Sequence, residues 1–452
     1  MRSYTISDIK LNPNKVFILQ KSEIEKRLDP FYYVPELVEL EKKVLAKNPK
    51  KLRDYVKGIA SGATPKTAEV EKYYSDEQNG MPFLRVQNLS PTGILEFEDC
   101  KYINKETHNG MLKRSQVSAG DLLVKITGVG RMAVASVAPE NFEGNINQHI
   151  CVIKTGSKEV SETLAAYLNS DIAERLASRR STGGTRPALD YPALLSIPII
   201  EDKRILEITK KVVEQKKQNE AEADRLLSSI DDYLLGELGI KLPEPHENTL
   251  KNRMFTVSLK DISGGRFDPF YNQKHFDILK NPKAKFHTRR IKEISEEIKT
   301  GLPVRKDFRA TDGAYPYYGA NGIIGYMDEY THNGKYLVIG QDGYIGNHYV
   351  VNGKFWGSNH NWVLKLKNNY DYNFVKAVLD VLNYDYLITG GVIPKLTKEA
   401  LESIRIPIPF FDKQKEIAEH ISKIREQAQK LKDQTAELLK EASKEIENIL
   451  LN

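Results

Sequence analysis

The chain has 452 residues, of which 40% are hydrophobic and 28% charged, so it is long enough for two or three globular domains and too apolar for a disordered protein. Its 67 basic and 61 acidic side chains leave a net charge of +6, which permits nucleic-acid binding without requiring it. The two cysteines, Cys100 and Cys151, form no Cys-x-x-Cys pair, which argues against structural zinc and a disulfide framework. We find no signal-peptide core and no run of about 18 apolar residues, and therefore expect a cytoplasmic protein.

In chain order, short apolar runs between Gly-rich turns predict strands, and longer periodic stretches predict helices. The predicted strands are residues 121–126, 148–154, 335–339 and 361–367, and the predicted helices are residues 159–179, 202–238, 373–386 and 412–451. The two halves have the same order of strands, short helix and long helix. This order predicts an α+β unit of roughly 170 to 200 residues that occurs twice.

The two halves also share sequence motifs in the same order. Arg-x-Asp-Pro-Phe-Tyr begins at Arg27 and again at Arg266, a separation of 239 residues that also relates Gly62 to Gly301. Asn147-Gln148-His149 resembles Ser358-Asn359-His360 at a separation of 211 residues, and Thr-Gly-Gly begins at Thr182 and Thr389, at a separation of 207. Ile197-Pro198 and Asp202-Lys203 match Ile406-Pro407 and Asp412-Lys413. The middles diverge, which predicts a duplicated frame that reads two different targets; the alternative is a duplicated scaffold without functional meaning.

Each half ends in a long helix with a narrow apolar seam. Residues 412–451 contain no Gly or Pro, and their apolar residues recur every three or four positions, as in a heptad repeat. The seam of residues 202–238 is similar but is interrupted by Gln215 and Asn219. Neither helix can bury its seam alone, so we expect the two to pair as an antiparallel coiled coil; the alternative is that each packs on its own unit. The predicted domains are residues 1–198, 199–240, 241–408 and 409–452.

The sequence contains no complete catalytic motif. Asp29-Pro30-Phe31-Tyr32 and its second copy resemble the Asp-Pro-Pro-Tyr loop of amino-methyltransferases, but Phe replaces the second Pro and no Gly-rich cofactor loop lies nearby. We interpret both copies as buried aromatic anchors. Gly128-Val129-Gly130 lacks the third Gly of a dinucleotide site, and P-loop, nuclease and nucleophile-elbow patterns are absent. His149 and His360 fit a polar DNA clamp and a structural histidine equally well.

Cationic, amide and aromatic side chains gather in the divergent middles, where we predict DNA contacts. Arg, Asn and Gln carry the forked donors and acceptors that read base edges, and a Gly pair lets a loop approach phosphates. The candidate DNA-binding residues are Arg85, Gln87, Asn88, Lys125, Thr127, Arg131, Arg179, Arg180, Thr182 and Arg186 in the first unit, and Arg305, Lys306, Tyr317, Tyr318, Asn321, Gln341, Tyr344, Asn347, His348 and Lys395 in the second. We expect Arg180 and Arg186, on either side of a Gly pair, to contact DNA directly.

Together these motifs resemble the specificity subunit of type I restriction–modification systems over almost the whole chain. The resemblance is carried by Arg-x-Asp-Pro-Phe-Tyr, Ser61-Gly-Ala-Thr-Pro, the strand beginning Gly120-Asp-Leu-Leu, the Thr-Gly-Gly loop, the Ile-Pro boundary and the helix with Gln414. The second unit departs from it at Leu302-Pro303, where no Thr precedes Pro, and the first long helix lacks the Gln.

The resemblance implies a chain without a catalytic centre. Residues 1–198 and 241–408 would be target-recognition domains that each read one half of a split DNA site. The two long helices would set the gap between the half-sites and dock two modification subunits. S-adenosylmethionine would belong to those subunits, and ATP and Mg²⁺ to separate motor–nuclease subunits, so that no cofactor or metal is expected in this chain.

Three alternatives remain open at this stage. The chain could serve another restriction–modification class in which methylase and nuclease are fused in the partner. It could be a coiled-coil scaffold with two ligand-binding lobes and no DNA partner. It could also be a free-standing methyltransferase, against which the missing cofactor loop argues.

Overall fold

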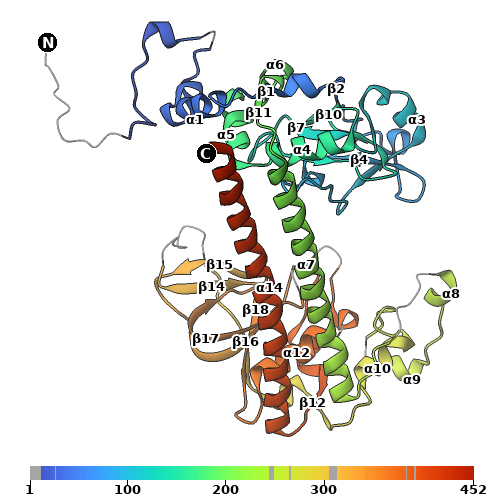
Figure 1. Cartoon of the computed structure of the whole chain (residues 1–452). Coiled ribbons are helices and arrows are strands. Elements are labelled where there is room, and N and C mark those ends of the chain that lie inside the picture. Colours follow the sequence, from blue (N-terminus) through green and yellow to red (C-terminus); the bar gives the residue numbers. More distant parts are fainter. Residues whose placement is uncertain are drawn as a thin grey trace, which may run out of the picture. The chain divides into compact units, whose positions relative to one another are not determined.

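A computed structural model describes residues 12–25, 27–243, 249–263, 266–304, 313–343, 345–382, 384–390 and 393–452. The chain divides into two compact units (Figure 1). Unit 1 consists of Met1–Asn219 and Asp433–Asn452, and unit 2 consists of Glu220–Lys432. Both long helices, α7 (Lys203–Leu238) and α14 (Phe411–Leu451), therefore contribute residues to both units. The predicted division at residues 198, 240 and 408 stays a prediction.

Unit 1 contains two antiparallel-rich sheets. One has the order β2 (Gly58–Ser61), β10 (Ile150–Lys154), β7 (Leu122–Lys125) and β8 (Ala135–Val137). The other has the order β3 (Tyr74–Ser75), β5 (Lys101–Ile103), β4 (Met81–Leu84), β9 (Glu143–Ile146) and β6 (Gln116–Ser118). Its helices include α1 (Pro35–Leu45), α3 (Lys105–Asn109) and α6 (Tyr191–Leu195). Strands β7 and β10 are buried along most of their length, as their continuous apolar runs predict.

The helix predicted over residues 159–179 is in fact two helices, α4 (Lys158–Leu168) and α5 (Asp171–Arg180). The side chain of Asn169 accepts from the backbone N–H of Ala135 (3.0 Å) and donates to the carbonyl of the same residue (2.7 Å). Ser170 then caps α5 by accepting from the N–H of Ala173. The bonds of Asn169 to Ala135 and the Ser170 cap compete with the helical hydrogen bonds at this point, which explains the break.

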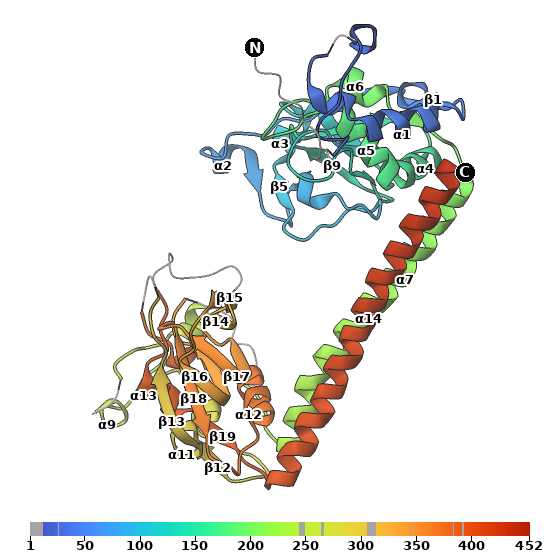
Figure 2. The ribbon, with the colours of Figure 1, turned by 90° about the vertical axis from the view of Figure 1, so that its left-hand side faces the viewer.

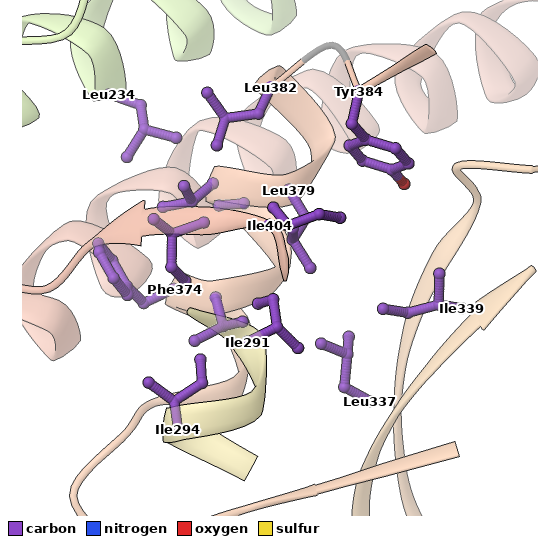
Figure 3. Packing of buried hydrophobic residues seen from close by; sticks show 14 of the residues in the cluster. Leu234, Ile291, Ile294, Leu337, Ile339, Phe374, Leu379, Leu382, Tyr384 and Ile404 are labelled. Atoms are coloured by element: carbon purple, nitrogen blue, oxygen red, sulfur yellow. The ribbon is translucent and has the colours of Figure 1, made fainter. Parts of the chain in front are cut away.

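Unit 2 is built on one six-stranded sheet. Its order is β13 (Ser295–Thr300), β18 (Asn361–Leu366), β16 (His332–Gly340), β17 (His348–Gly357), β14 (Tyr315–Gly319) and β15 (Gly322–Met327). Helix α12 (Tyr372–Val381) lies beside β17 and ends earlier than the predicted 373–386 (Figure 2). The core of this unit joins Leu234 of α7, Ile291 of α11 (Ile291–Ile294), Phe374 of α12 and Leu337 of β16 (Figure 3).

The two long helices contact each other inside each unit. In unit 1, Ile205 of α7 shares a buried cluster with Ile446 and Leu450 of α14. In unit 2, Leu234 and Leu238 of α7 share one with Ile417 and Ile421 of α14. Both helices also pack on the globular part of each unit, because the same clusters contain residues of the sheets and short helices.

Each unit also contains a short pair of antiparallel strands. Strand β1 (Lys50–Lys51) pairs with β11 (Pro198–Ile199), and β12 (Thr288–Arg290) pairs with β19 (Arg405–Pro407). Lys50 opposes Ile199 in the first pair, and Arg289 opposes Ile406 in the second. The structure therefore aligns Ile199 with Ile406, and the predicted match of Ile197-Pro198 with Ile406-Pro407 is wrong by two residues. A two-residue slip keeps the same face of a strand buried, so the hydrophobic pattern alone did not reveal it.

Candidate nucleic-acid interface

The Arg-x-Asp-Pro-Phe-Tyr motif makes the same contact in both units. Arg27 pairs with Asp29 and donates to the carbonyls of Arg180 (2.8 Å) and Ser181 (2.9 Å). Arg266 pairs with Asp268 and donates to the carbonyl of Leu387 (3.2 Å). The motif thus binds the segment that leads into the Thr-Gly-Gly loop. It is a structural anchor, but Arg makes the anchoring bonds and the Phe of each copy is exposed, so the predicted burial of the aromatic is wrong there.

In each unit, a repeated glycine lies very close to the backbone of another repeated segment. A Cβ added to Gly62 would collide with the backbone at Ile146, and one added to Gly301 would collide with the backbone at Gly357. The N–H of Gly62 donates to the carbonyl of Ile150 (3.3 Å), and that of Gly301 donates to Asn361 (3.2 Å). Only glycine permits this close approach, which explains its presence in both units.

In both units, the Thr-Gly-Gly loop forms backbone hydrogen bonds at equivalent positions. Thr182 and Ala188 exchange two backbone hydrogen bonds of 2.8 Å. Thr389 and Lys395 exchange two of 2.9 and 2.7 Å. Bridges join Thr127 to Ala188 and Asp342 to Lys395, so Thr127 and Asp342 occupy equivalent places. The carbonyls of His149 and His360 accept from the N–H groups of Ile126 and Gln341 (2.9 Å each), which makes these two histidines equivalent as well.

In unit 1 the segment after Gly62, the Asn147-Gln148-His149 segment and the Thr-Gly-Gly loop bring four polar side chains together. We call these side chains the unit 1 cluster; they are Thr64, Gln148, His149 and Arg186. Thr64 donates to the Gln148 side-chain oxygen. His149 Nε2 lies 3.1 Å from Arg186 Nη2 and 3.4 Å from Gln148 Nε2, so it accepts from both. Thr64, Gln148 and Arg186 are exposed. Gln148 and Thr64 were not among the candidate residues, although both lie in repeated motifs that could have pointed to them.

Burial and then the Arg186 charge lower the pKa of His149. The imidazole is therefore neutral near pH 7, with Nε2 accepting and the proton on Nδ1. An exposed guanidinium beside a neutral imidazole gives the unit 1 cluster a positive charge. Such a cluster suits a polyanionic ligand or the acceptor edge of a base.

In unit 2 the equivalent segments form the unit 2 cluster, consisting of Asp342, His360 and Lys395. His360 Nδ1 lies 2.7 Å from Asp342 Oδ1, and Thr300 donates to the carbonyl of Asn359 (3.4 Å). His360 and Lys395 are exposed, and Asp342 is half-buried. The same backbone frame thus presents a carboxylate next to the histidine in unit 2, where unit 1 presents Thr127.

The structure corrects the expected role of Arg179 and Arg180. Both guanidinium groups bind the carboxylate of Glu41, and their side chains are only 7% and 9% exposed. Arg179 also donates to the carbonyl of Tyr32 and lies over its ring, 3.9 Å from the centroid. Arg180 donates to the carbonyl of Leu176 and to Ser196 Oγ. These cations hold α1 and α5 together, and a DNA contact by either side chain would require local rearrangement.

Five other candidates are buried in the fold. They are Asn88, Lys125, Tyr317, Gln341 and His348. Asn88 donates to the carbonyl of Glu96 (2.9 Å), and Lys125 donates to that of Val129 (2.7 Å). Burial lowers the pKa of Lys125, as expected for a desolvated ammonium group. A direct DNA contact by these five side chains would require local rearrangement.

His348 belongs to a polar network inside unit 2. Its Nδ1 lies 2.9 Å from Asp380 Oδ1, and its Nε2 lies 2.6 Å from the hydroxyl of Tyr384. Asp380 also binds Lys376 and Arg425 of α14. Burial tends to raise the pKa of Asp380, but the bonds from His348 and Lys376 outweigh it and hold the pKa below its ordinary value. The network fixes β17 and α12 against α14.

The remaining candidates that the structure describes lie at or near the surface. Arg85 and Arg131 are engaged, with Arg85 donating to the carbonyl of Asp99 (2.6 Å) and Arg131 paired with Asp171 (2.6 Å). The exposed candidates are Gln87, Thr182, Arg186, Asn321 and Lys395, and the half-buried ones are Thr127, Tyr318 and Asn347. Arg305, Lys306 and Tyr344 lie outside the described residues. Of the twenty candidates, the structure brings Thr182, Arg186 and Thr127 to the Thr-Gly-Gly loop of unit 1, and Lys395 to that of unit 2.

Within the described part of the chain, no group of three or more His, Cys, Asp or Glu side chains could hold a metal ion. No helix in the same residues is long and apolar enough to cross a membrane.

Comparison with known proteins gives one family. Residues 283–441 match the family model described as the type I restriction modification DNA specificity domain. A protein of Haemophilus influenzae named as a type I restriction enzyme specificity subunit is 38% identical over 119 residues, which are 25% of this chain and 31% of that protein. One of Mycoplasma pneumoniae, named as a type I specificity subunit, is 30% identical over 159 residues, which are 34% of this chain and 43% of that protein. The matched segments thus span less than half the length of these two relatives.

A solved S subunit of a type I restriction–modification system from M. genitalium is also similar, with a TM-score of 0.42 at 15% identity, over 89% of this chain and 94% of that one. The sequence comparisons confirm the family resemblance seen in the motifs, and residues 283–441 match the model of the type I restriction modification DNA specificity domain.

Proposed function

We propose that the chain is the DNA specificity subunit of a type I restriction–modification enzyme, in which each unit reads one half of a bipartite site. The observation that carries this proposal is the convergence of the same three motifs in each unit. They form an exposed polar cluster on an equivalent backbone frame, with different side chains in the two units. A repeated frame with different exposed groups suits the recognition of two different DNA sequences.

In this proposal α7 and α14 form an antiparallel coiled coil that fixes the gap between the half-sites. The support is the contact between the two helices in both units and a buried polar bond between Asn219 Nδ2 and Thr435 Oγ1 (3.0 Å) in unit 1. A single buried polar pair in an apolar seam specifies the register of two helices. The same helices offer a docking surface to two modification subunits.

The proposed chain is not an enzyme. S-adenosylmethionine would be bound by the modification subunits, and ATP and Mg²⁺ by motor–nuclease subunits, while this chain supplies sequence recognition. Its ligand is double-stranded host DNA, which places its work in the cytoplasm.

The test compares the purified chain, the modification subunits encoded beside it, and the assembled complex. Each is incubated with labelled S-adenosylmethionine and genomic DNA from a host that lacks the system. We expect methyl transfer by the complex and none by the chain alone. A mobility shift of the complex at two salt concentrations should weaken as salt rises, because phosphate contacts release counterions. Methyl transfer by the pure chain would contradict the proposal, and so would a complex that binds no DNA.

A further inference from the structure

The described residues of the loops 182–188 and 389–395, which are 389–390 and 393–395 in the second loop, form the same backbone hydrogen bonds in both units. In each loop, two reciprocal backbone hydrogen bonds join the first residue to the last one. The second residue of each loop is a glycine with a left-handed backbone conformation, Gly183 (φ +93°) and Gly390 (φ +97°). A leucine follows each loop, and its N–H donates to the carbonyl of the residue just after a strand, Leu189 to Ile126 after β7 and Leu396 to Gln341 after β16 (2.8 Å each). The described residues of the second loop can therefore be compared with those 207 positions earlier in the first loop.

The side chains at two positions differ in chemistry between the loops, and at the first of them both side chains are exposed. Arg186 of unit 1 corresponds to Ile393 of unit 2, and Ala188 corresponds to Lys395. Arg186 is exposed, and Ile393 is 66% exposed. Since neither side chain is buried, packing does not explain why one loop carries a cation and the other an aliphatic group. Different exposed side chains at equivalent backbone positions indicate that the two loops contact different parts of a ligand.

Arg186 is available for recognition, unlike its two neighbours in the same segment. Its Nη2 donates to His149, and among the described residues it has no carboxylate partner, whereas Arg179 and Arg180 bind Glu41. Its other N–H groups keep the fork geometry that pairs with O6 and N7 of guanine. Ile393 can form no hydrogen bond, and an aliphatic group at a base edge recognises the methyl group of thymine.

We propose that Arg186 and Ile393 are specificity-determining residues: Arg186 reads a guanine in one half-site, and Ile393 reads the methyl group of a thymine in the other. This inference rests on the proposed function and deepens it, because it assigns one base to each unit.

The test removes single atoms from the DNA. The methylated motif of the wild-type complex is first determined in a host, and short duplexes with that motif are then prepared. In one series each guanine is replaced in turn by 7-deazaguanine, which lacks N7. In the other series each thymine is replaced in turn by deoxyuridine, which lacks the methyl group. Binding of the complete complex to each duplex is measured.

We expect one 7-deazaguanine duplex to bind the wild-type complex about 5- to 150-fold more weakly, as for the loss of a good base contact. The variant Arg186→Ile should bind the unmodified duplex with a similar loss and should not respond to that replacement. One deoxyuridine duplex in the other half-site should bind about fourfold more weakly, which Ile393→Ala should abolish. Arg204→Ile is the matched control, because Arg204 is an exposed arginine of α7 that pairs with Asp202 and is not part of the loop.

Two results would overturn the inference. If Arg186→Ile weakens binding to all duplexes alike and lowers the salt dependence by about one unit, Arg186 contacts a phosphate. If both variants bind every duplex as the wild type does while their thermal unfolding is unchanged, the loops face away from the DNA. A wild-type complex that methylates no split motif would instead contradict the proposed function itself.

Discussion

Replacing Glu41 by Gln tests whether the Arg179–Arg180 segment is structural. The Glu41 side chain is 12% exposed, and it is the carboxylate that balances two guanidinium groups exposed by only 7% and 9%. Burial lowers the pKa of Arg180, but its guanidinium stays charged near pH 7 and needs a compensating carboxylate. Removing one partner of a buried ion pair costs about 3–5 kcal/mol, because the other charge is left without compensation.

The expected change is large enough to measure by calorimetry of the whole chain. In a domain of 150–250 residues, 1 kcal/mol shifts the Tm by about 2–4 °C, so Glu41→Gln should lower the Tm of unit 1 by roughly 6–20 °C. Glu36→Gln is the matched control, because Glu36 pairs with Arg175 at the surface with side-chain exposures of 57% and 31%. An exposed pair contributes at most about 1 kcal/mol.

Two results would refute this reasoning. One is a Glu41→Gln protein that unfolds at the same temperature as Glu36→Gln. The other is an Arg180→Gln variant that keeps the wild-type Tm but binds DNA more weakly, since Arg180 would then contact DNA as the sequence alone suggested.

Three further predictions concern the glycines, acid stability and the helices. Gly62→Ala and Gly301→Ala should each lower the free energy of unfolding by about 1–3 kcal/mol, as measured by urea titration. Gly184→Ala should leave it unchanged, because a Cβ atom at Gly184 would meet open space. Burial lowers the pKa of His332, so the unfolded chain binds a proton at this histidine more readily than the folded chain does. The free energy of unfolding should therefore fall as the pH drops below about 6.5. The variant His332→Phe should reduce that loss, as measured by urea unfolding at pH 7.5 and pH 5. Four residues inserted after Asn219 lengthen α7 by about 6 Å, and methylation mapping should show a gap longer by one or two base pairs with unchanged half-sites; an unchanged gap would exclude the helices as the ruler.

Periodicity and repetition predicted much of the framework. The absence of Gly and Pro from residues 412–451 predicted α14 to within one residue at its start, and the ordered motifs predicted two units of similar construction. Gly62 and Gly301 mark a close approach of two backbones in both units. These features are local or repeated, so a single sequence contains the information needed to find them.

The roles of individual side chains depended on contacts distant in the sequence. Arg180 looked like a DNA contact because it lies beside a Gly pair, but its partner Glu41 is 139 residues away and no local pattern connects them. The break between α4 and α5 likewise depends on a hydrogen bond between Asn169 and Ala135 of β8, which lies 34 residues away in the sequence. The exposed cluster around His149 and Arg186 could be found only when three separate segments were placed together.

The most direct test of the account is the methylation pattern of host DNA in cells that contain the modification subunits, with and without this chain. The account predicts a motif of two specified parts separated by an unspecified gap of fixed length, methylated only when the chain is present. Exchanging residues 12–198 for the corresponding segment of a related subunit should change one part of the motif and leave the other part and the gap unchanged. A continuous motif, or methylation that does not depend on the chain, would contradict the claim that its two units read the two halves of one DNA site.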